Sequence, residues 1–219
     1  MTSAGALIVV GAGPSVGAAT ARRFAAEGYP VGLIARDPDR LSDLGHSLSA
    51  DRVTVATAAA DVTDTSALEG ALVEIADQLG DVDTMLFSPR PSLEWIKPVL
   101  ETTGEDVAAA LALNVVAAAN AVRAVVGPMI ARGTGTLLFT TGGAVLEPHR
   151  DRAVSGIAYA AESVWVRMLH DALAPKGVLA AQLTIVGGIG PDQRHHPAVV
   201  AEQLWQLRTD RDRQLMILR

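Results

Sequence analysis

The fold of this chain is decided by residues 7–17, which read LIVVGAGPSVG. Four apolar residues, enough for a short buried strand, run directly into Gly11, Gly13 and Gly17. A helical pattern follows from Ser15 to about Glu27. A strand, a glycine-rich turn and a helix N-terminus in this order predict a binding site for the pyrophosphate of a dinucleotide.

The glycines of this turn and the two residues at the helix N-terminus each contribute differently to the expected binding site. Gly11 allows the chain to turn sharply, and Gly13 has no Cβ, so a phosphate can approach the backbone. Gly17 allows the helix to pack close to the strand. Ser15 and Val16 stand at the helix N-terminus, where free N–H groups and the positive end of the helix dipole face an anion. We therefore expect all five residues to bind the cofactor.

The second strand predicts which dinucleotide is bound. It covers residues 31–35 and is followed by Arg36, where an acidic residue would accept hydrogen bonds from the ribose hydroxyls of NAD(H). A guanidinium offers a planar fork of donors to a 2′-phosphate, so the sequence favours NADP(H) over NAD(H). Two alternatives stay open: Arg36 as a solvated surface side chain, and pairing of Arg36 with Asp37.

Composition excludes several classes of protein. The chain has 219 residues, 49% hydrophobic and 19% charged, which suits one α/β domain with a buried sheet. It contains no cysteine, so disulfides, a thiolate nucleophile and a zinc–thiolate site are excluded. The net charge of −6 argues against nucleic-acid binding. We see no signal peptide and no apolar segment of membrane-spanning length, and expect a soluble, cytoplasmic protein.

Strand and helix patterns alternate along the whole chain. Strands separated by helices predict a single Rossmann-like domain over residues 1–219, with a doubly wound parallel sheet of about seven strands and helices on both faces. Ligands of such sheets bind at the carboxyl ends of the strands. The predicted strands are residues 7–10, 31–35, 53–56, 83–87, 136–140, 179–186 and 214–218, and the predicted helices are residues 15–27, 41–48, 66–79, 104–130, 154–173 and 197–207.

Four further motifs stand at the ends of strands or inside the long helices. Asp61-Val62 follow the third strand, Asn114 lies in ALNVV, Tyr159 lies in a long helix, and Gly188-Ile189 follow the sixth strand. With the glycine-rich turn, they resemble the short-chain dehydrogenase/reductase family over nearly the whole chain. The resemblance implies that Asp61 binds the adenine amino group with Val62 beside it. It also implies that Gly188 and Ile189 contact the nicotinamide carboxamide.

The same resemblance implies a catalytic set, from which this sequence departs. The family carries Tyr-x-x-x-Lys, but Ser163 stands at the lysine position. Gly142 stands at the position expected for the catalytic serine, with Thr141 one residue before it. The segment Phe87-Ser88-Pro89-Arg90 replaces the family's Asn-Asn-Ala-Gly, and we expect Ser88 to contact the cofactor there.

These departures change the expected proton chemistry. In the family a lysine ammonium lowers the tyrosine pKa from about 10 toward neutrality. Ser163 carries no charge, so Tyr159 stays protonated and is suited to donating a hydrogen bond to a carbonyl, which favours reduction. We take Tyr159, Thr141 and Asn114, the last as holder of a relay water, as the catalytic candidates. A structural tyrosine packed in the core is the alternative for Tyr159.

Other polar residues give weaker signals. Arg90 follows the fourth strand and could bind a substrate carboxylate, and His149 could act as an acid or base, but surface positions are favoured for both. The pair His195-His196 has no carboxylate cluster beside it in the sequence, so no metal site is predicted. Glu162 is expected either to accept a proton or to lie on the helix surface.

Three functions remain open at this stage. The first is an NADP(H)-dependent oxidoreductase that reduces a carbonyl-like group of a small molecule. The second is a cofactor-binding module without redox turnover, and the third is a non-redox enzyme on the same fold. The helices at residues 104–130 and 154–173 are rich in alanine and valine, and in the family such helices pair between subunits, so we expect a homodimer or homotetramer.

Overall fold

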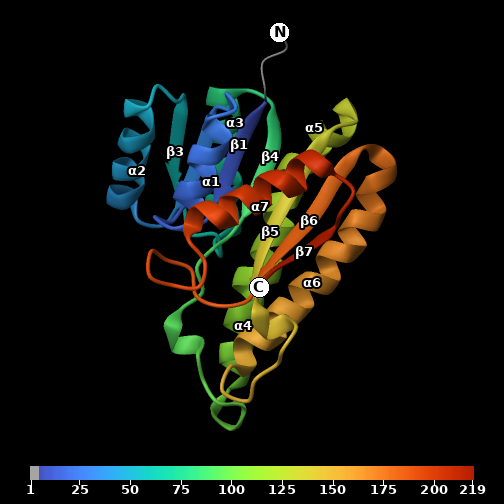
Figure 1. The fold of residues 1–219 in the computed structure, drawn as a ribbon. Coiled ribbons are helices and arrows are strands. Elements are labelled where there is room, and N and C mark those ends of the chain that lie inside the picture. The colour runs from blue at the N-terminus through green and yellow to red at the C-terminus, as the bar shows by residue number, and fades with distance from the viewer. Residues whose placement is uncertain (1–4) are drawn as a thin grey trace.

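Seven parallel strands form the centre of the molecule in the order β3-β2-β1-β4-β5-β6-β7 (Figure 1). The structure is a computed structural model that describes residues 5–219. This confirms the predicted doubly wound parallel sheet. The strands are β1 (Ala6–Val10), β2 (Val31–Ala35), β3 (Val55–Ala59), β4 (Val82–Phe87), β5 (Gly135–Gly142), β6 (Val178–Ile185) and β7 (Leu215–Leu218).

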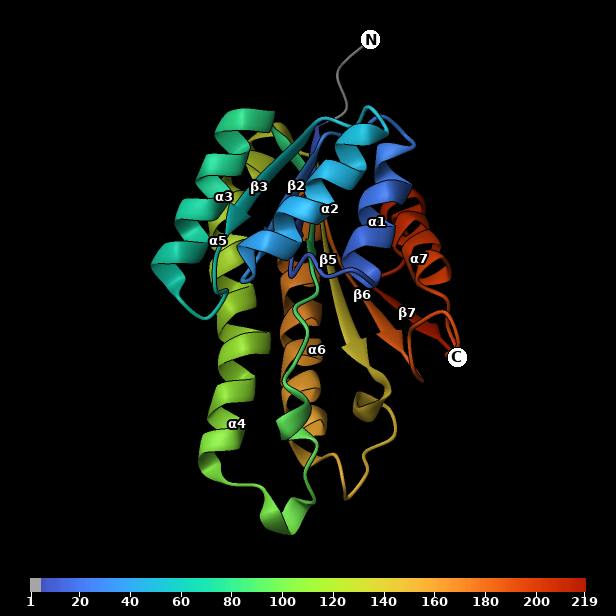
Figure 2. The same ribbon diagram turned by 90° about the vertical axis from the view of Figure 1, so that its left-hand side faces the viewer.

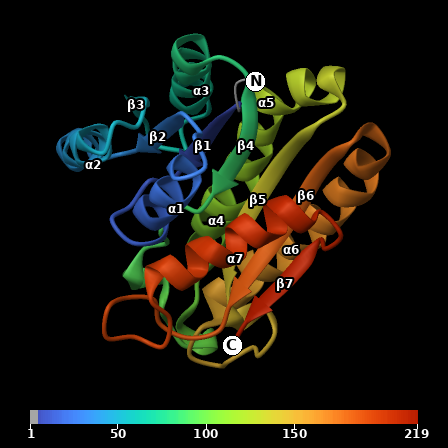
Figure 3. The ribbon, with the colours of Figure 1, turned by 45° about the horizontal axis from the view of Figure 1, so that its top comes forward.

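Helices cover both faces of the sheet, as Figure 2 shows from the side. On one face lie α1 (Val16–Ala25), α2 (Pro38–Ala50) and α7 (Pro197–Asp210), and α1 packs along α7 (Figure 3). On the other lie α3 (Thr65–Leu79), α5 (Ala117–Arg132) and α6 (Ala153–Leu173). The helix α4 (Gly104–Leu111) leads into α5 through a π-turn at Ala112–Val116. Short 3₁₀ turns occupy Leu93–Trp95, Val99–Glu101, Gly143–Val145 and Ala174–Lys176.

The alternation of side chains along β1 explains why both faces are covered. Leu7 and Val9 enter the core beneath α1, α2 and α7, whereas Ile8 and Val10 enter the core beneath α3, α5 and α6. All residues of β1 and of β6 are buried. A strand that is buried on both sides reads as a continuous apolar run, which is the pattern that the sequence presents.

The strand order reverses between β1 and β4, and this reversal positions the site. β1 pairs with β2 on one side and with β4 on the other. After β1 the chain continues to strands on one side of the sheet, and after β4 it continues to strands on the other side. The carboxyl ends of β1 and β4 therefore border a crevice.

Two predicted elements differ from the structure. The third strand lies at Val55–Ala59 rather than residues 53–56, because its alanines carry little strand propensity and its register with β2 decides its position. The long helix predicted at residues 104–130 continues to Arg132 and contains the π-turn. It ends at Gly133, which adopts the left-handed conformation.

The prediction that no apolar segment reaches membrane-spanning length was wrong. The continuous helix Gly104–Arg132 is long and apolar enough to cross a membrane by length and composition, with a mean hydropathy of 1.8 over an 18-residue stretch. Its alanines and valines raise the hydropathy, and part of that surface, including Ala117, Ala121 and Val125, packs in the core. A helix in the core of a protein can be as long and as apolar as a helix that spans a membrane.

Candidate active site

A groove of about 970 Å³ lies at the carboxyl ends of β1, β2 and β3. It is larger than the second cavity, which lies between α1 and α7. Its walls combine the turns after these strands with the segment after β4, with α1 and α2, and with the end of α4. Its lining residues are Gly11–Pro14, Ala18, Arg22, Ala35–Asp37, Arg40, Asp43, Leu44, Ser47, Ala60–Thr63, Pro89, Arg90, Ser92, Trp95, Ala109, Ala112 and Leu113.

The glycines of the first turn have different surroundings. Gly11 has φ +92°, and a Cβ there would lie 2.6 Å from the backbone of Pro89. A Cβ on Gly17 would lie 3.0 Å from Cα of Ala12, so α1 packs tightly on the turn. A Cβ on Gly13 would meet nothing within 4 Å, because this glycine opens onto the groove. The turn therefore leaves room for an anion at Gly13 alone of these three.

Arg36 lies in the groove without an ion-pair partner within the described residues. Asp37 instead caps α2 by accepting from the Arg40 backbone N–H at 3.1 Å, and its carboxylate lies 3.2 Å from the Arg40 guanidinium. The alternative pairing of Arg36 with Asp37 is not formed. The Arg36 guanidinium is available to an anionic ligand.

Asp61 lines the same groove as an ionised carboxylate. Its Oδ1 accepts from the hydroxyl of Thr63 at 2.7 Å and from the backbone N–H of Thr63 at 2.9 Å. These two hydrogen bonds, with the nearby charge of Arg36, hold the pKa of Asp61 below its usual value. The second carboxylate oxygen has no hydrogen bond within the described chain and is free to accept one from a ligand amino group. Val62 beside it is buried.

The other predicted cofactor residues do not line the groove. Ser15 is the N-cap residue of α1, its Oγ is buried without a hydrogen-bond partner in the described chain, and Val16 begins the helix. The Oγ of Ser88 lies 2.7 Å from the Oγ1 of Thr140.

The turn after β6 is covered by the segment that follows it. The side chain of Gln193 packs directly against Gly188. Ile189 pairs with His195, whose Nε2–H donates to the carbonyl oxygen of Val186 at 2.9 Å. Gly188 and Ile189 therefore stand outside both cavities.

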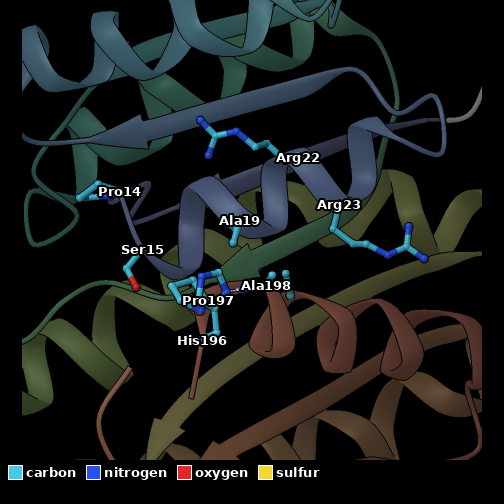
Figure 4. Close-up of a pocket in the computed structure, with 9 residues that line it drawn as sticks. Pro14, Ser15, Ala19, Arg22, Arg23, His196, Pro197 and Ala198 are labelled. Atoms are coloured by element: carbon cyan, nitrogen blue, oxygen red, sulfur yellow. Dashed lines mark hydrogen bonds between the residues drawn. The ribbon is translucent and has the colours of Figure 1, made fainter. Parts of the chain in front are cut away.

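A smaller cavity of about 450 Å³ lies between α1 and α7 (Figure 4). Ser15 and His196 both line it, and the side chains of Arg22 and Arg23 point away from these two residues. Arg23 is neutralised by Glu27 and Glu202. Arg22 has no ion pair within the described residues, and its guanidinium donates to the Oγ of Ser47 at 3.1 Å.

Tyr159 lies at the carboxyl end of β5, where its ring packs on Gly142. A Cβ on Gly142 would stand 3.0 Å from Cε2 of this ring, so a serine would displace the tyrosine by a few tenths of an ångström. Burial, together with the charge of Glu162, raises the pKa of Tyr159 to about 12. The phenol is protonated throughout the neutral range.

Thr141 of β5 and Asn114 of the π-turn are both buried. The Oγ1 of Thr141 accepts from Nε2 of Gln182 at 2.8 Å and lies 3.1 Å from the Oγ1 of Thr184. This hydroxyl is engaged inside the sheet, and we assign no proton transfer to it. Asn114 lies in the π-turn and donates from Nδ2 to the carbonyl oxygen of Ala110 at 2.9 Å.

The sequence missed one feature of this region and left others open. Glu162 is 1% exposed, so the structure excludes the helix-surface position, one of the two alternatives that the sequence left open for it. Because the residues around Glu162 in the sequence are small, the pattern of apolar residues along α6 does not indicate that Glu162 is buried. Arg90 lines the groove and is exposed. His149 accepts from the Asp151 backbone N–H and His196 from that of Ala198, so both have local partners.

Comparison with known proteins identifies the family. The family of short chain dehydrogenases matches residues 6–192, and the chain belongs to it. Its fold and groove are those of an NAD(P)-binding oxidoreductase.

Relatives of known sequence share limited identity with the chain. It is 33% identical over 128 residues to the glycine betaine reductase of Emericella nidulans, a match that covers 58% of this chain and 10% of that protein. It is 23% identical over 177 residues to an uncharacterized oxidoreductase of Staphylococcus epidermidis, covering 81% of this chain and 75% of the relative. The chain thus spans only a tenth of the first relative and three quarters of the second.

Solved structures show the same fold. The short-chain dehydrogenase of Rhodopseudomonas palustris superposes with a TM-score of 0.87 at 24% identity, covering 98% of each chain. The L-sorbose reductase of Gluconobacter frateurii, complexed with NADPH and L-sorbose, gives 0.88 at 20% identity over 98% and 94% of the two chains. An NADPH-bound short chain oxidoreductase of Pseudomonas aeruginosa with an atypical catalytic center gives 0.87 at 18% identity over 97% and 95%.

The contrast between Gly11 and Gly13 yields a test of the groove. Gly13→Val places a side chain in the open groove, so dinucleotide binding is expected to disappear while the circular dichroism spectrum stays unchanged. Gly11→Val introduces both a backbone clash and a strained φ, which costs roughly 1–3 kcal/mol or more of stability, and is expected to lower the Tm. Cofactor fluorescence titration measures binding. Tight binding by a folded Gly13→Val variant would place the cofactor elsewhere.

Proposed function

We propose that this chain is an NADP(H)-dependent reductase of a carbonyl group on a small molecule. The observation that carries the proposal is the guanidinium of Arg36, which lies in the groove beside the glycine-rich turn and has no ion-pair partner within the described residues. An arginine binds a 2′-phosphate through a planar fork of charge-assisted hydrogen bonds. The fold neighbours that hold NADPH, among them an L-sorbose reductase, support both the cofactor and the reaction.

The residues of the groove fit a dinucleotide. Gly13 leaves open the space that a Cβ would fill, and the N-terminus of α1 begins two residues later at Ser15 and Val16. In the proposed arrangement Gly13 and this helix N-terminus hold the pyrophosphate, and Asp61 accepts from the adenine amino group. The bound cofactor supplies a hydride to the carbonyl carbon.

Tyr159 is the proposed proton donor. Its raised pKa keeps the proton on the phenol at neutral pH, so that a proton is present for the carbonyl oxygen of a substrate and the reverse reaction is disfavoured. The catalytic set of the family is incomplete, since Ser163 and Gly142 replace a lysine and a serine. The buried Oγ of Ser163 has no hydrogen-bond partner in the described chain, and the ring of Tyr159 lies against Gly142.

This incomplete set also favours a second candidate function, a cofactor-binding module without redox turnover. A neighbour that is described with an atypical catalytic center binds NADPH, which is compatible with either function. NADPH binding combined with no oxidation in the presence of a panel of aldehydes and ketones would favour the second candidate.

We further propose that the chain self-associates through its long helices. Ile157, Val164 and Met168 are exposed by 44%, 46% and 58%, and their spacing places them on one stripe of α6. Sedimentation is expected to give a dimer or tetramer, and Val164→Arg to give smaller species with an unchanged circular dichroism spectrum. Val73→Arg, at an exposed valine of α3, is the control. A monomeric wild-type chain contradicts this proposal.

The cofactor preference is tested at Arg36. Charge-assisted hydrogen bonds contribute about 1.5–3 kcal/mol each, so Arg36→Ala is expected to weaken NADPH binding at least tenfold, roughly, and to leave NADH binding unchanged. Arg40→Ala is the comparison, and a smaller loss is expected because Asp37 already neutralises Arg40. Equal losses for NADPH and NADH in Arg36→Ala would refute the assignment.

The proton donor is tested by Tyr159→Phe, which removes the hydroxyl and keeps the ring. General acid catalysis contributes about 10²–10⁴-fold, so kcat for carbonyl reduction is expected to fall within that range while NADPH affinity is preserved. Tyr29→Phe alters the only other tyrosine of the chain and serves as the control. An unchanged kcat in Tyr159→Phe would make this tyrosine structural.

A further inference from the structure

A buried carboxyl group lies beside the proposed proton donor. Glu162 is 1% exposed, and its Oε2 has no hydrogen-bond partner within residues 5–219. Because it follows Tyr159 by three positions, both side chains lie on one side of α6. An ionised carboxylate is costly to bury without a partner, so such a group stays neutral until the pH is raised.

The burial pattern of α6 shows where Glu162 faces. Ala158, one turn before Glu162, packs with Ala110 of α4. Val166, one turn after it, belongs to the core cluster that α5 covers. Asn114 follows Ala110 by one turn on the opposing helix, and α6 packs against this π-turn. Glu162 therefore lies at the level of the π-turn, between the two apolar contacts.

The elements packed against α6 offer no cation at this level. The segments β5, β6, Ala112–Val116 and Gly143–Val145 contain no titratable residue. The titratable groups nearby lie on α4, beyond the end of α6 and on α6 itself. The first turn of α4 carries Glu105 and Asp106, the latter paired with Lys97, and Lys176 lies beyond the end of α6. On α6 they are Tyr159, the exposed Arg167 and Asp171, and His170, whose Nδ1 lies 3.0 Å from the carbonyl oxygen of Ala180.

The electrostatic coupling between the two groups has a definite sign. Burial raises the pKa of Glu162 well above that of a free glutamate. Once ionised, Glu162 disfavours a second negative charge on the neighbouring phenol, which contributes to the raised pKa of Tyr159. Neutral Glu162 allows Tyr159 to release its proton more readily than ionised Glu162 does.

We propose that Glu162 is the ionisable group that governs proton release by Tyr159, one position before the residue where the family carries its lysine. This inference rests on the proposed reductase function. In the reaction the carbonyl carbon gains the hydride, the carbonyl oxygen gains the proton of Tyr159, and the resulting phenolate regains a proton from solvent. Glu162 is a positioning residue, active in its neutral form and inhibitory when ionised.

The coupling is measured in the free protein by NMR of chain labelled with ¹³Cζ-tyrosine. The resonance absent from Tyr159→Phe belongs to Tyr159. It is expected to move with pH, with a midpoint above the pKa of a free glutamate. The movement is expected to vanish in Glu162→Gln and to persist in Asp171→Asn, which removes an exposed carboxylate from the same helix.

The pH dependence of carbonyl reduction gives the second readout. Wild-type kcat is expected to fall about tenfold per pH unit above the same midpoint, and Glu162→Gln to lose this decline. A flat Tyr159 resonance in the wild-type chain overturns the inference even if Glu162→Gln does not fold. An unchanged decline in folded Glu162→Gln also overturns it. If the resonance titrates but no carbonyl is reduced, the proposed function fails and the coupling stands.

Discussion

The close approach between the turn after β1 and the segment after β4 is the constraint on which the site depends. Gly11 stands where any side chain would strike the backbone of Ser88 and Pro89, and it adopts a conformation that suits glycine. This contact brings β1 and β4 together at the point where the strand order reverses. Ala18 and Arg22 of α1 line the groove that forms there, and Arg36 and Asp61, which follow β2 and β3, lie in its walls.

Three arginines line the groove without an ion pair within the described residues: Arg22, Arg36 and Arg90. Asp37 caps α2 and binds Arg40, and Asp61 is occupied on one oxygen by Thr63. Neither carboxylate forms an ion pair with Arg36 in the described structure, so binding of Arg36 to a phosphate would break no ion pair. Local helix capping therefore serves the binding site as well as the fold.

The sequence predicted the sheet, because buried parallel strands consist of continuous runs of apolar residues. It predicted the glycine-rich turn, because two backbone segments can approach closely only where one of them carries glycine. The predicted third strand begins two residues before the observed one, because the alanines of Val55–Ala59 form a strand only through pairing with β2. The groove position of Gly11, Gly13, Arg36, Asp61 and Val62 was within reach of sequence patterns. The burial of Glu162 was not, because burial of a charged side chain depends on how α6 packs against its neighbours.

The region around Tyr159 combines three changes that fit one another. A glycine at position 142 leaves room for the tyrosine ring, a serine at position 163 removes the neighbouring positive charge, and Glu162 places a titratable acid within the same helix. A carboxyl whose pKa is raised by folding binds its proton more tightly in the folded chain. Stability therefore falls as the pH rises from the usual glutamate pKa of about 4.3 through the raised pKa of Glu162. A leucine or methionine at this buried position would avoid that loss. An acid beside Tyr159 is therefore explained better by the proposed proton chemistry than by packing.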